Sequence, residues 1–301
     1  MIQLNQLTKR YGEVTAVDHL DLTVRAGVVT GFLGPNGAGK TTTMRMILGL
    51  DLPTSGSVTI DGRLYRDLPT PLREVGSLLD AQAVHPRRSA RDHLLYLAQS
   101  NGIKAGRVAE VLDIVGLSDA ARRKAGDFSL GMCQRLGIAA ALLGDPPVLL
   151  FDEPVNGLDP EGVVWIRTLI RSLAAEGRTV LVSSHLMSEM ALTADRLVIV
   201  GKGRLIAEAD TAEFTTTGEE VFVRTDDPAF ARRLELVGAQ VLSQEGGFVV
   251  AGITAPDIGR LAAAEGVTLY ELTPRRTSLE TAFMELTRDS VEYSAGQGAA
   301  R

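Results

Sequence analysis

One segment near the amino end limits the possible folds more than any other part of the sequence. A nearly continuous apolar run at 28–33 is followed by a glycine-rich stretch at 34–39, and a helical pattern begins near Lys40. Such a run is typical of a parallel strand that is buried on both faces. Glycine allows the tight backbone turns that a loop of this length needs. The segment therefore predicts a strand, a loop and a helix, the repeating unit of α/β proteins.

The glycine-rich stretch matches the pattern G-x-x-x-x-G-K-[ST], which is known as Walker A. Backbone N–H groups in such a loop converge on an anion at the start of the helix, where the helix dipole favours negative charge. We expect Lys40 to reach the β- and γ-phosphates of a nucleotide and the Thr41 hydroxyl to hold Mg²⁺. The alternative is a glycine-rich turn that happens to precede a helix. The residues predicted to bind ATP are Gly34, Pro35, Asn36, Gly37, Ala38, Gly39, Lys40, Thr41 and Thr42.

A second apolar run, at 148–151, ends in two adjacent acids, Asp152 and Glu153. Ligands of α/β sheets gather at the carboxyl ends of the parallel strands. We expect Asp152 to contact Mg²⁺, as a Walker B aspartate does, and Glu153 to polarise a water that attacks the γ-phosphate. An ordinary solvated strand end is the alternative, and it is the better explanation of two acids that stand alone.

The first 214 residues combine this core with two additions. Alternating apolar residues within 2–24 and at 58–60 predict an antiparallel sheet. The pattern from 88 to 143 is mostly helical and too long for a simple crossover, so we predict a helical subdomain there. The predicted fold class is α/β, with a P-loop NTPase core, an antiparallel β subdomain, a helical subdomain and a small C-terminal α+β (ferredoxin-like) domain.

The C-terminal part has a different pattern. Strands are predicted at 220–224, 240–242, 248–251 and 267–272, and helices at 228–237, 255–264 and 279–286. This βαββαβα order resembles a ferredoxin-like module. The polar stretch Thr215 to Gly218 is the predicted boundary, which gives an ATPase domain at 1–214 and an accessory domain at 219–290. The tail at 291–301 is predicted to be disordered.

The composition limits which kinds of partner and which cellular compartment we expect for this chain. The 31 basic residues against 37 acidic ones give a net charge of −6, and a nucleic-acid-binding chain normally needs a basic face, so we expect no nucleic acid partner. The single cysteine, Cys133, suits a reducing cytoplasm. No window offers the roughly 20 apolar residues that span a bilayer, and we expect no signal peptide.

The segment 128–135, Phe-Ser-Leu-Gly-Met-Cys-Gln-Arg, narrows the interpretation further. Ser129 is a good N-cap for a helix at 130–143, and the free N–H groups at that helix start form a second anion site. A plain helix cap is the alternative. Together with the two earlier motifs, this segment resembles the signature of the ATP-binding cassette (ABC) ATPases, and the resemblance covers roughly Met1 to Ala207.

The resemblance implies that each ATP is enclosed by the Walker A loop of one subunit and the signature of another. Ser129 and Gly131 then contact ATP in trans, and so does Asp159, in the segment through which subunits of the family meet. His185 matches the switch histidine that hydrogen-bonds the γ-phosphate. Tyr11 matches the aromatic residue that stacks on adenine, with ordinary strand packing as the alternative.

The sequence departs from the family pattern in several places. Asp80 takes the place of the usual glutamine and Gln82 follows two residues later, so either is a candidate for contact with Mg²⁺ or the attacking water. Leu130 replaces the more usual glycine and Met132 the usual glutamine, a variant that resembles export-type members. Cys133 stands where a basic residue is common, and we expect it only to pack or to face solvent.

The leading hypothesis is therefore the ATPase subunit of a multidrug or antibiotic exporter. ATP binding with Mg²⁺ closes a dimer, and hydrolysis, with Glu153 and His185 as the catalytic residues, reopens it. The expected partners are a second copy or a paralogous ATPase subunit, and integral membrane permease subunits that dock at 80–91 on the cytoplasmic face of the cell membrane. The alternatives are a non-transport cassette, such as a translation factor or a repair ATPase, and a kinase or GTPase, which would not account for the signature.

Overall fold

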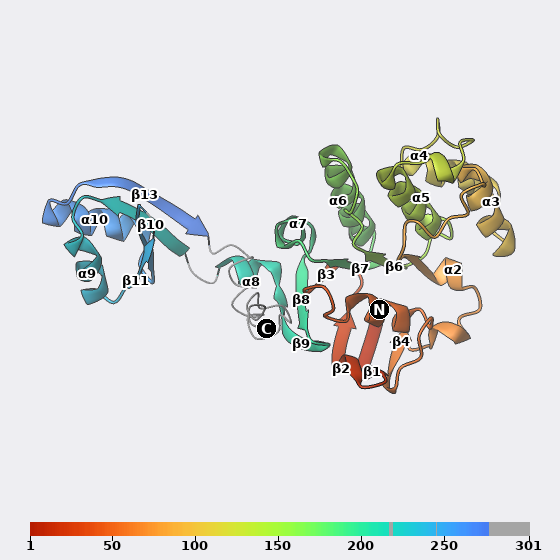
Figure 1. Cartoon of the computed structure of the whole chain (residues 1–301), viewed down its shortest axis with the longest axis horizontal. Helices are drawn as coiled ribbons and strands as arrows, with labels where there is room; N and C mark the ends of the chain where they lie inside the picture. Colours follow the sequence, from red (N-terminus) through yellow and green to blue (C-terminus); the bar gives the residue numbers. More distant parts are fainter. Residues whose placement is uncertain (217–218, 245, 277–301) are drawn as a thin grey trace, which may run out of the picture. The chain divides into compact units, whose positions relative to one another are not determined.

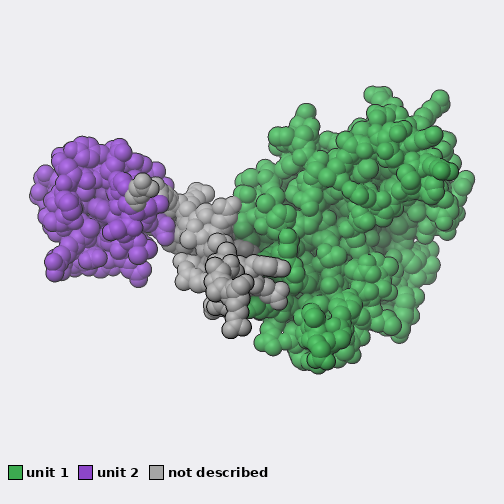
Figure 2. All heavy atoms as spheres, viewed as in Figure 1, with its two compact units in different colours: residues 1–209, 287–301 green, residues 210–286 purple. Residues whose placement is uncertain are grey.

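The computed structural model describes residues 1–216, 219–244 and 246–276. The helix predicted at 279–286 and the tail at 291–301 lie outside these residues. The chain divides into two compact units between Ala209 and Asp210 (Figure 2). This division falls before the boundary predicted at 214, because part of the polar stretch expected to be a linker is the end of a helix, α8 (Thr211–Thr216).

A six-stranded sheet forms the centre of the first unit. Its strands, in order, are β5 (Val75–Leu78), β6 (Val148–Asp152), β7 (Thr179–Ser184), β3 (Val29–Leu33), β8 (Arg196–Gly201) and β9 (Arg204–Asp210). The first five run parallel to one another. Every residue of β3, β6 and β7 is buried, as the continuous apolar runs predict. The sequence patterns do not identify β8 and β9, which a two-residue turn joins.

The three-stranded antiparallel sheet is confirmed and lies on one side of the central sheet (Figure 1). Its order is β2 (Val14–Val24), β1 (Ile2–Tyr11) and β4 (Ser55–Ile60), and Ile2 pairs with both Val24 and Ile60. Helix α1 (Lys40–Ile47) contacts strands of both sheets. One apolar core joins the two sheets through α1, which fixes the helix that follows the glycine-rich loop.

Helices cover the opposite face of the central sheet (Figure 1). Helices α6 (Pro160–Ala175) and α7 (Met187–Thr193) pack there, and neither is identified by the sequence patterns. A separate group of helices, called the helical block below, forms the predicted helical subdomain. The helical block contains α3 (Ala90–Ser100), α4 (Gly106–Ile114), the 3₁₀ turn η2 (Ala125–Asp127) and α5 (Leu130–Leu142), and its three α-helices pack on one another. Two short elements, η1 (Tyr65–Asp67) and α2 (Pro71–Glu74), precede β5.

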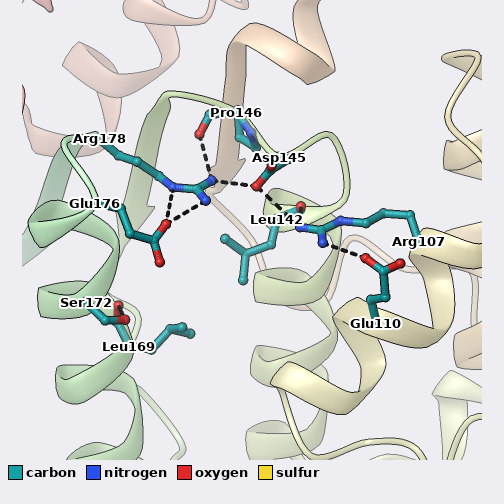
Figure 3. Close-up of polar contacts among 9 residues, drawn as sticks. All are labelled: Arg107, Glu110, Leu142, Asp145, Pro146, Leu169, Ser172, Glu176 and Arg178. Carbon is teal, nitrogen blue, oxygen red and sulfur yellow. Dashed lines mark hydrogen bonds and ion pairs between the residues drawn. The ribbon is translucent and has the colours of Figure 1, made fainter.

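Polar contacts join the helical block to the core where α5 ends (Figure 3). The Asp145 carboxylate lies 2.9 Å from Arg178 Nη1 and 3.4 Å from Arg107 Nη2. Arg178 also donates to the carbonyl of Pro146 and to the carboxylate of Glu176. These contacts connect α4, the end of α5 and the loop before β7. They therefore hold in place the short segment through which the chain passes from α5 into β6.

The second unit has the predicted ferredoxin-like arrangement. Its elements follow the order β10 (Glu219–Thr225), α9 (Ala229–Leu236), β11 (Gln240–Gln244), β12 (Gly247–Ala251), α10 (Ala255–Glu265) and β13 (Leu269–Arg276). The sheet order is β11-β12-β10-β13, with antiparallel pairing throughout. An apolar core of its own joins the strands to α9 and α10.

Candidate functional site

The glycine-rich loop between β3 and α1 is held too tightly for side chains at two of its positions. A Cβ atom on Gly34 would lie 2.5 Å from the carbonyl oxygen of Val200, and one on Gly39 would lie 2.4 Å from that of Ala16. Gly39 is the N-cap of α1 and has a φ of 96°, a conformation that favours glycine. The loop therefore needs glycine at both positions. The first N–H groups of α1 have no preceding helical turn to which they could donate.

A cavity of about 400 Å³ opens above this loop. It is lined by Tyr11, Ala16, Pro35, Asn36, Gly37, Ala38, Gly39, Lys40, Thr41, Thr42 and Glu153. The structure thus brings Tyr11, predicted to stack on adenine, to the same cavity as the phosphate loop. The Tyr11 side chain is 48% exposed, and its hydroxyl donates to Asp51 Oδ2 at 2.9 Å. Lys9 Nζ lies over the Tyr11 ring, 4.9 Å from its centroid. A half-exposed aromatic ring and a cradle of backbone N–H groups fit a nucleotide.

Lys40 is buried at the bottom of the cavity, 7% exposed. Its Nζ donates to the carbonyl of Gly34 at 2.7 Å and lies 3.7 Å from Glu153 Oε1. Burial lowers the pKa of Lys40, while the nearby carboxylates of Glu153 and Asp152 act in the opposite direction. The site therefore places the ammonium group of Lys40 next to the two predicted acids, Asp152 and Glu153.

Thr41 and Asp152 form an oxygen-rich pair beside Lys40. The Thr41 hydroxyl donates to Asp152 Oδ2 at 2.6 Å, and the Ser183 hydroxyl donates to the other carboxylate oxygen of Asp152. Mg²⁺ binds oxygen ligands, commonly one or two from the protein together with substrate phosphates. The donor set therefore fits Mg²⁺, with Thr41 and Asp152 as the residues that would hold it.

Glu153 lies between two other predicted residues. His185 Nδ1 is 2.8 Å from Glu153 Oε2, while Lys40 faces the other carboxylate oxygen. Glu153 has a φ of 49°, in the left-handed region, and its backbone N–H donates to Ser183 Oγ at 3.0 Å. The two residues predicted to be catalytic thus contact each other at the edge of the phosphate cavity.

Asp80 and Gln82 lie in a second cavity, of about 360 Å³, together with Asp152 and Glu153. Asp80 Oδ1 accepts a hydrogen bond from the backbone N–H of Gln82 at 2.8 Å. Both side chains are exposed. The structure therefore places both Asp80 and Gln82 near Asp152 and Glu153, so both stay candidates for contact with Mg²⁺ or the attacking water.

Ser129, Gly131 and Asp159, the residues predicted to contact ATP in trans, lie outside the phosphate cavity. Ser129 Oγ accepts from the N–H of Met132 at 3.2 Å and caps α5, and Asp159 Oδ1 accepts from the N–H of Gly162 at 2.9 Å and caps α6. Gly131 faces the carbonyl oxygen of Gly157, which a Cβ atom on Gly131 would approach to 2.8 Å. Among the described residues, those lining the phosphate cavity do not include Ser129, Gly131 or Asp159. The two predicted anion-binding surfaces of the chain are thus separate.

Two residues that contact the site have no role in the sequence-based prediction. Gln134 is buried and its Nε2 donates to the carbonyl oxygen of Glu153 at 3.1 Å. Ser183 contacts both Asp152 and the backbone of Glu153. Gln134 belongs to the signature segment and Ser183 to a predicted buried strand, but the sequence does not indicate their contacts with Asp152 and Glu153, because these partners come from another part of the chain.

Comparison with family models gives two matches. Residues 17–156 match the model described as ABC transporter, and residues 219–280 match a domain of unknown function (DUF8746). The first match includes both the glycine-rich loop and the two acids, and the second corresponds to the second unit.

Among curated proteins, the chain is 46% identical to the bacitracin transport ATP-binding protein BcrA of Bacillus licheniformis, over 69% of each chain. It is 37% identical to the uncharacterized ABC transporter ATP-binding protein YhcH of Bacillus subtilis, over 97% of each. The lantibiotic transport ATP-binding protein SrtF of Streptococcus pyogenes is 37% identical over 70% of this chain and 91% of its own length.

Solved structures show the same fold. An ATP-binding subunit of an ABC transporter has a TM-score of 0.66 and 26% identity, covering 71% of this chain and 91% of its own. An ATP-binding cassette solved as a dimer in a post-hydrolysis state, bound to ADP and Pi, has a TM-score of 0.64 and 27% identity. It covers 70% of this chain and 99% of its own.

Proposed function

Because the chain belongs to the ATP-binding subunits of ABC transporters, we propose that it powers export of an antibiotic-like substrate through separately encoded permease subunits. It is an ATPase of the cassette type. What the proposal adds is the role of each residue, the dimer, the membrane partner and the direction and class of transport.

One observation carries the proposed chemistry: the Glu153 carboxylate lies between Lys40 and His185 at the edge of the phosphate cavity. Lys40 contacts the β- and γ-phosphates, which places the γ-phosphorus next to Glu153. Glu153 accepts the proton of the attacking water as a general base. His185 hydrogen-bonds the γ-phosphate and, through Nδ1, fixes the direction of the Glu153 carboxylate.

Mg²⁺ would neutralise the charge that develops on the phosphate oxygens during transfer. Thr41 and Asp152 would hold it, and Ser183 orients Asp152 by donating to its second oxygen. Either Asp80 or Gln82 would contact the ion or the attacking water from the second cavity, which both line together with Asp152.

A dimer completes the site. Ser129 and Asp159 are exposed helix caps, and the first N–H groups of α5 form an anion-binding surface away from the chain's own phosphate cavity. We propose that Ser129, Gly131 and Asp159 reach the ATP of a second copy or a paralogous subunit. Tyr11 stacks on the adenine. A related cassette solved as a dimer with ADP and Pi supports this arrangement.

Relatives suggest the transported substrate. Two of the relatives are named for bacitracin transport and lantibiotic transport, which supports a peptide antibiotic as the substrate class. No helix in the described part of the chain is long and apolar enough to cross a membrane. We propose that the chain sits at the cytoplasmic face of the membrane and that its permease docks at 80–91 and on the helical block.

The decisive test is Glu153→Gln. This change keeps the shape of the side chain but removes the base, so ATP binding is retained and hydrolysis slows by roughly 10²–10⁴-fold. ATP-dependent dimers then accumulate, which size-exclusion chromatography detects. Turnover equal to that of the unchanged chain would remove Glu153 from the mechanism.

The membrane partner is tested separately. The chain, expressed with its neighbouring genes, is expected to co-purify with an integral membrane protein in detergent. Co-purification with ribosomes instead would favour a cassette protein that acts in translation, and would contradict the proposed transport.

A further inference from the structure

The helix capped by Ser129 also contacts the hydrolytic site of its own subunit. Leu130 and Gln134 are one turn apart on α5, so they lie on the same face of the helix. Both line the cavity that Glu153 also lines. Gln134 is only 4% exposed, and its Nε2 donates to the Glu153 carbonyl oxygen at 3.1 Å. This face of α5 therefore rests on the segment that carries the proposed base.

The first turn of α5 adds a second contact with that segment. Gly157 has a φ of 76°, and a Cβ atom on it would lie 2.4 Å from Leu130 Cγ. The Leu130 side chain thus occupies the space that a larger residue at 157 would need. Leu130 and Gln134 together hold α5 against both ends of the segment from Glu153 to Gly157.

The backbone conformation of Glu153 needs such support. Its φ of 49° is unfavourable for a residue with a Cβ atom. Its carbonyl accepts from Gln134 and from the N–H of Asn156 at 3.2 Å, and its own N–H donates to Ser183 Oγ. Because φ sets the direction of the Cα–Cβ bond, this conformation aims the carboxylate at His185 and Lys40.

We infer that Gln134 is a positioning residue, whose amide group holds Glu153 in the left-handed conformation that directs its carboxylate to the attacking water. This inference rests on the proposed role of Glu153 as the base. It gives α5 two tasks: the Ser129 end contacts the nucleotide held by the partner, and the Gln134 face supports hydrolysis in its own subunit. The position of one helix thus links the two nucleotide sites of the dimer.

The first test is Gln134→Met, which keeps the length of the side chain and removes the N–H donor. We expect kcat to fall about tenfold, the worth of one hydrogen bond. KM for ATP stays the same, because Gln134 is not among the residues that line the phosphate cavity. Gln134→Glu also lacks the donor and lowers kcat at least as much. Cys133→Ser is the matched control, since Cys133 is the next residue but lines a different cavity.

The second test repeats the change in the Glu153→Gln background. If Gln134 acts through Glu153, adding Gln134→Met lowers the residual single-turnover rate by less than about twofold, because coupled changes are not additive. The ATP-dependent dimer still accumulates, since the Ser129 end of α5 is intact. The same loss of rate in both backgrounds, or loss of the dimer in the double variant, would mean a general role in folding α5 and would overturn the inference. If Glu153→Gln alone hydrolyses ATP normally, the proposed base is wrong and the inference fails with it.

Discussion

Two opposing effects act on the pKa of Lys40 in this site. The side chain is almost completely buried, which disfavours its charged form and lowers its pKa. Glu153 and Asp152 favour the charged form. The protonation of Lys40 is therefore coupled to these two carboxylates. A nucleotide adds further negative charge beside Lys40 and so favours its charged form.

We expect Lys40→Met to weaken ATP binding by about 10- to 100-fold, because a hydrogen bond to a charged group contributes about 1.5–3 kcal/mol. Titration with a fluorescent ATP analogue measures this. A neutral lysine does not attract phosphate, so wild-type affinity falls as pH rises towards the ordinary lysine pKa of 10.5, and the lowered pKa makes this fall begin earlier.

The Lys40→Met variant supplies the control for this pH dependence, since it has no ammonium group to lose. Its affinity for the analogue is expected to stay constant over the alkaline range in which the wild-type affinity falls. Equal affinities of the two proteins at neutral pH would exclude a phosphate contact by Lys40.

At the scale of elements, Arg178 and Asp145 show how the helical block is joined to the core. Arg178 is 19% exposed, and it is hydrogen-bonded to a backbone carbonyl as well as to two carboxylates. Asp145 has a φ of 52° directly before two prolines. The contacts of Arg178 thus hold a backbone turn that starts β6, the strand that delivers Asp152.

Arg178→Met is expected to lower the free energy of unfolding by about 1–3 kcal/mol, because the buried Pro146 carbonyl and the Glu176 carboxylate lose a charged donor. Urea unfolding followed by circular dichroism gives this value. The control is Arg122→Met, which changes an exposed arginine of the helical block and should alter stability by less than about 0.5 kcal/mol. Equal effects of the two changes would contradict a special role for Arg178.

Much of the fold follows from local sequence signals. The strand, glycine loop and helix at 28–47 are contiguous, and the alternating strands of the second unit are separated by clear turns, so both are predictable. Strand β8 is missed because no glycine or proline separates its apolar run from that of α7. The Gln134–Glu153 contact joins α5 to the residue that follows β6, and no local pattern indicates this contact or the left-handed φ of Glu153.

At the scale of the whole molecule, each unit has an apolar core of its own among the residues that the structure describes. One joins the two sheets and α1 of the first unit, and the other lies between the sheet and helices of the second. All residues that line the phosphate cavity belong to the first unit. Nucleotide binding should therefore stabilise the first unit directly.

Calorimetry of the full chain tests this independence. Two unfolding transitions are expected, because each unit has its own core. Mg²⁺-ATP at 100 times its Kd stabilises the unit that binds it by about 2.7 kcal/mol, which raises the midpoint of that transition by about 5–10 °C for a unit of this size. The second transition stays where it is. In the Lys40→Met variant the same ATP concentration is only about 1 to 10 times Kd, so it stabilises the first unit by about 0.4–1.4 kcal/mol and shifts its midpoint by at most about half as much. A single transition that shifts as a whole with ATP would show that the two units unfold together, and the second unit would then have to be treated as part of the nucleotide-binding machinery.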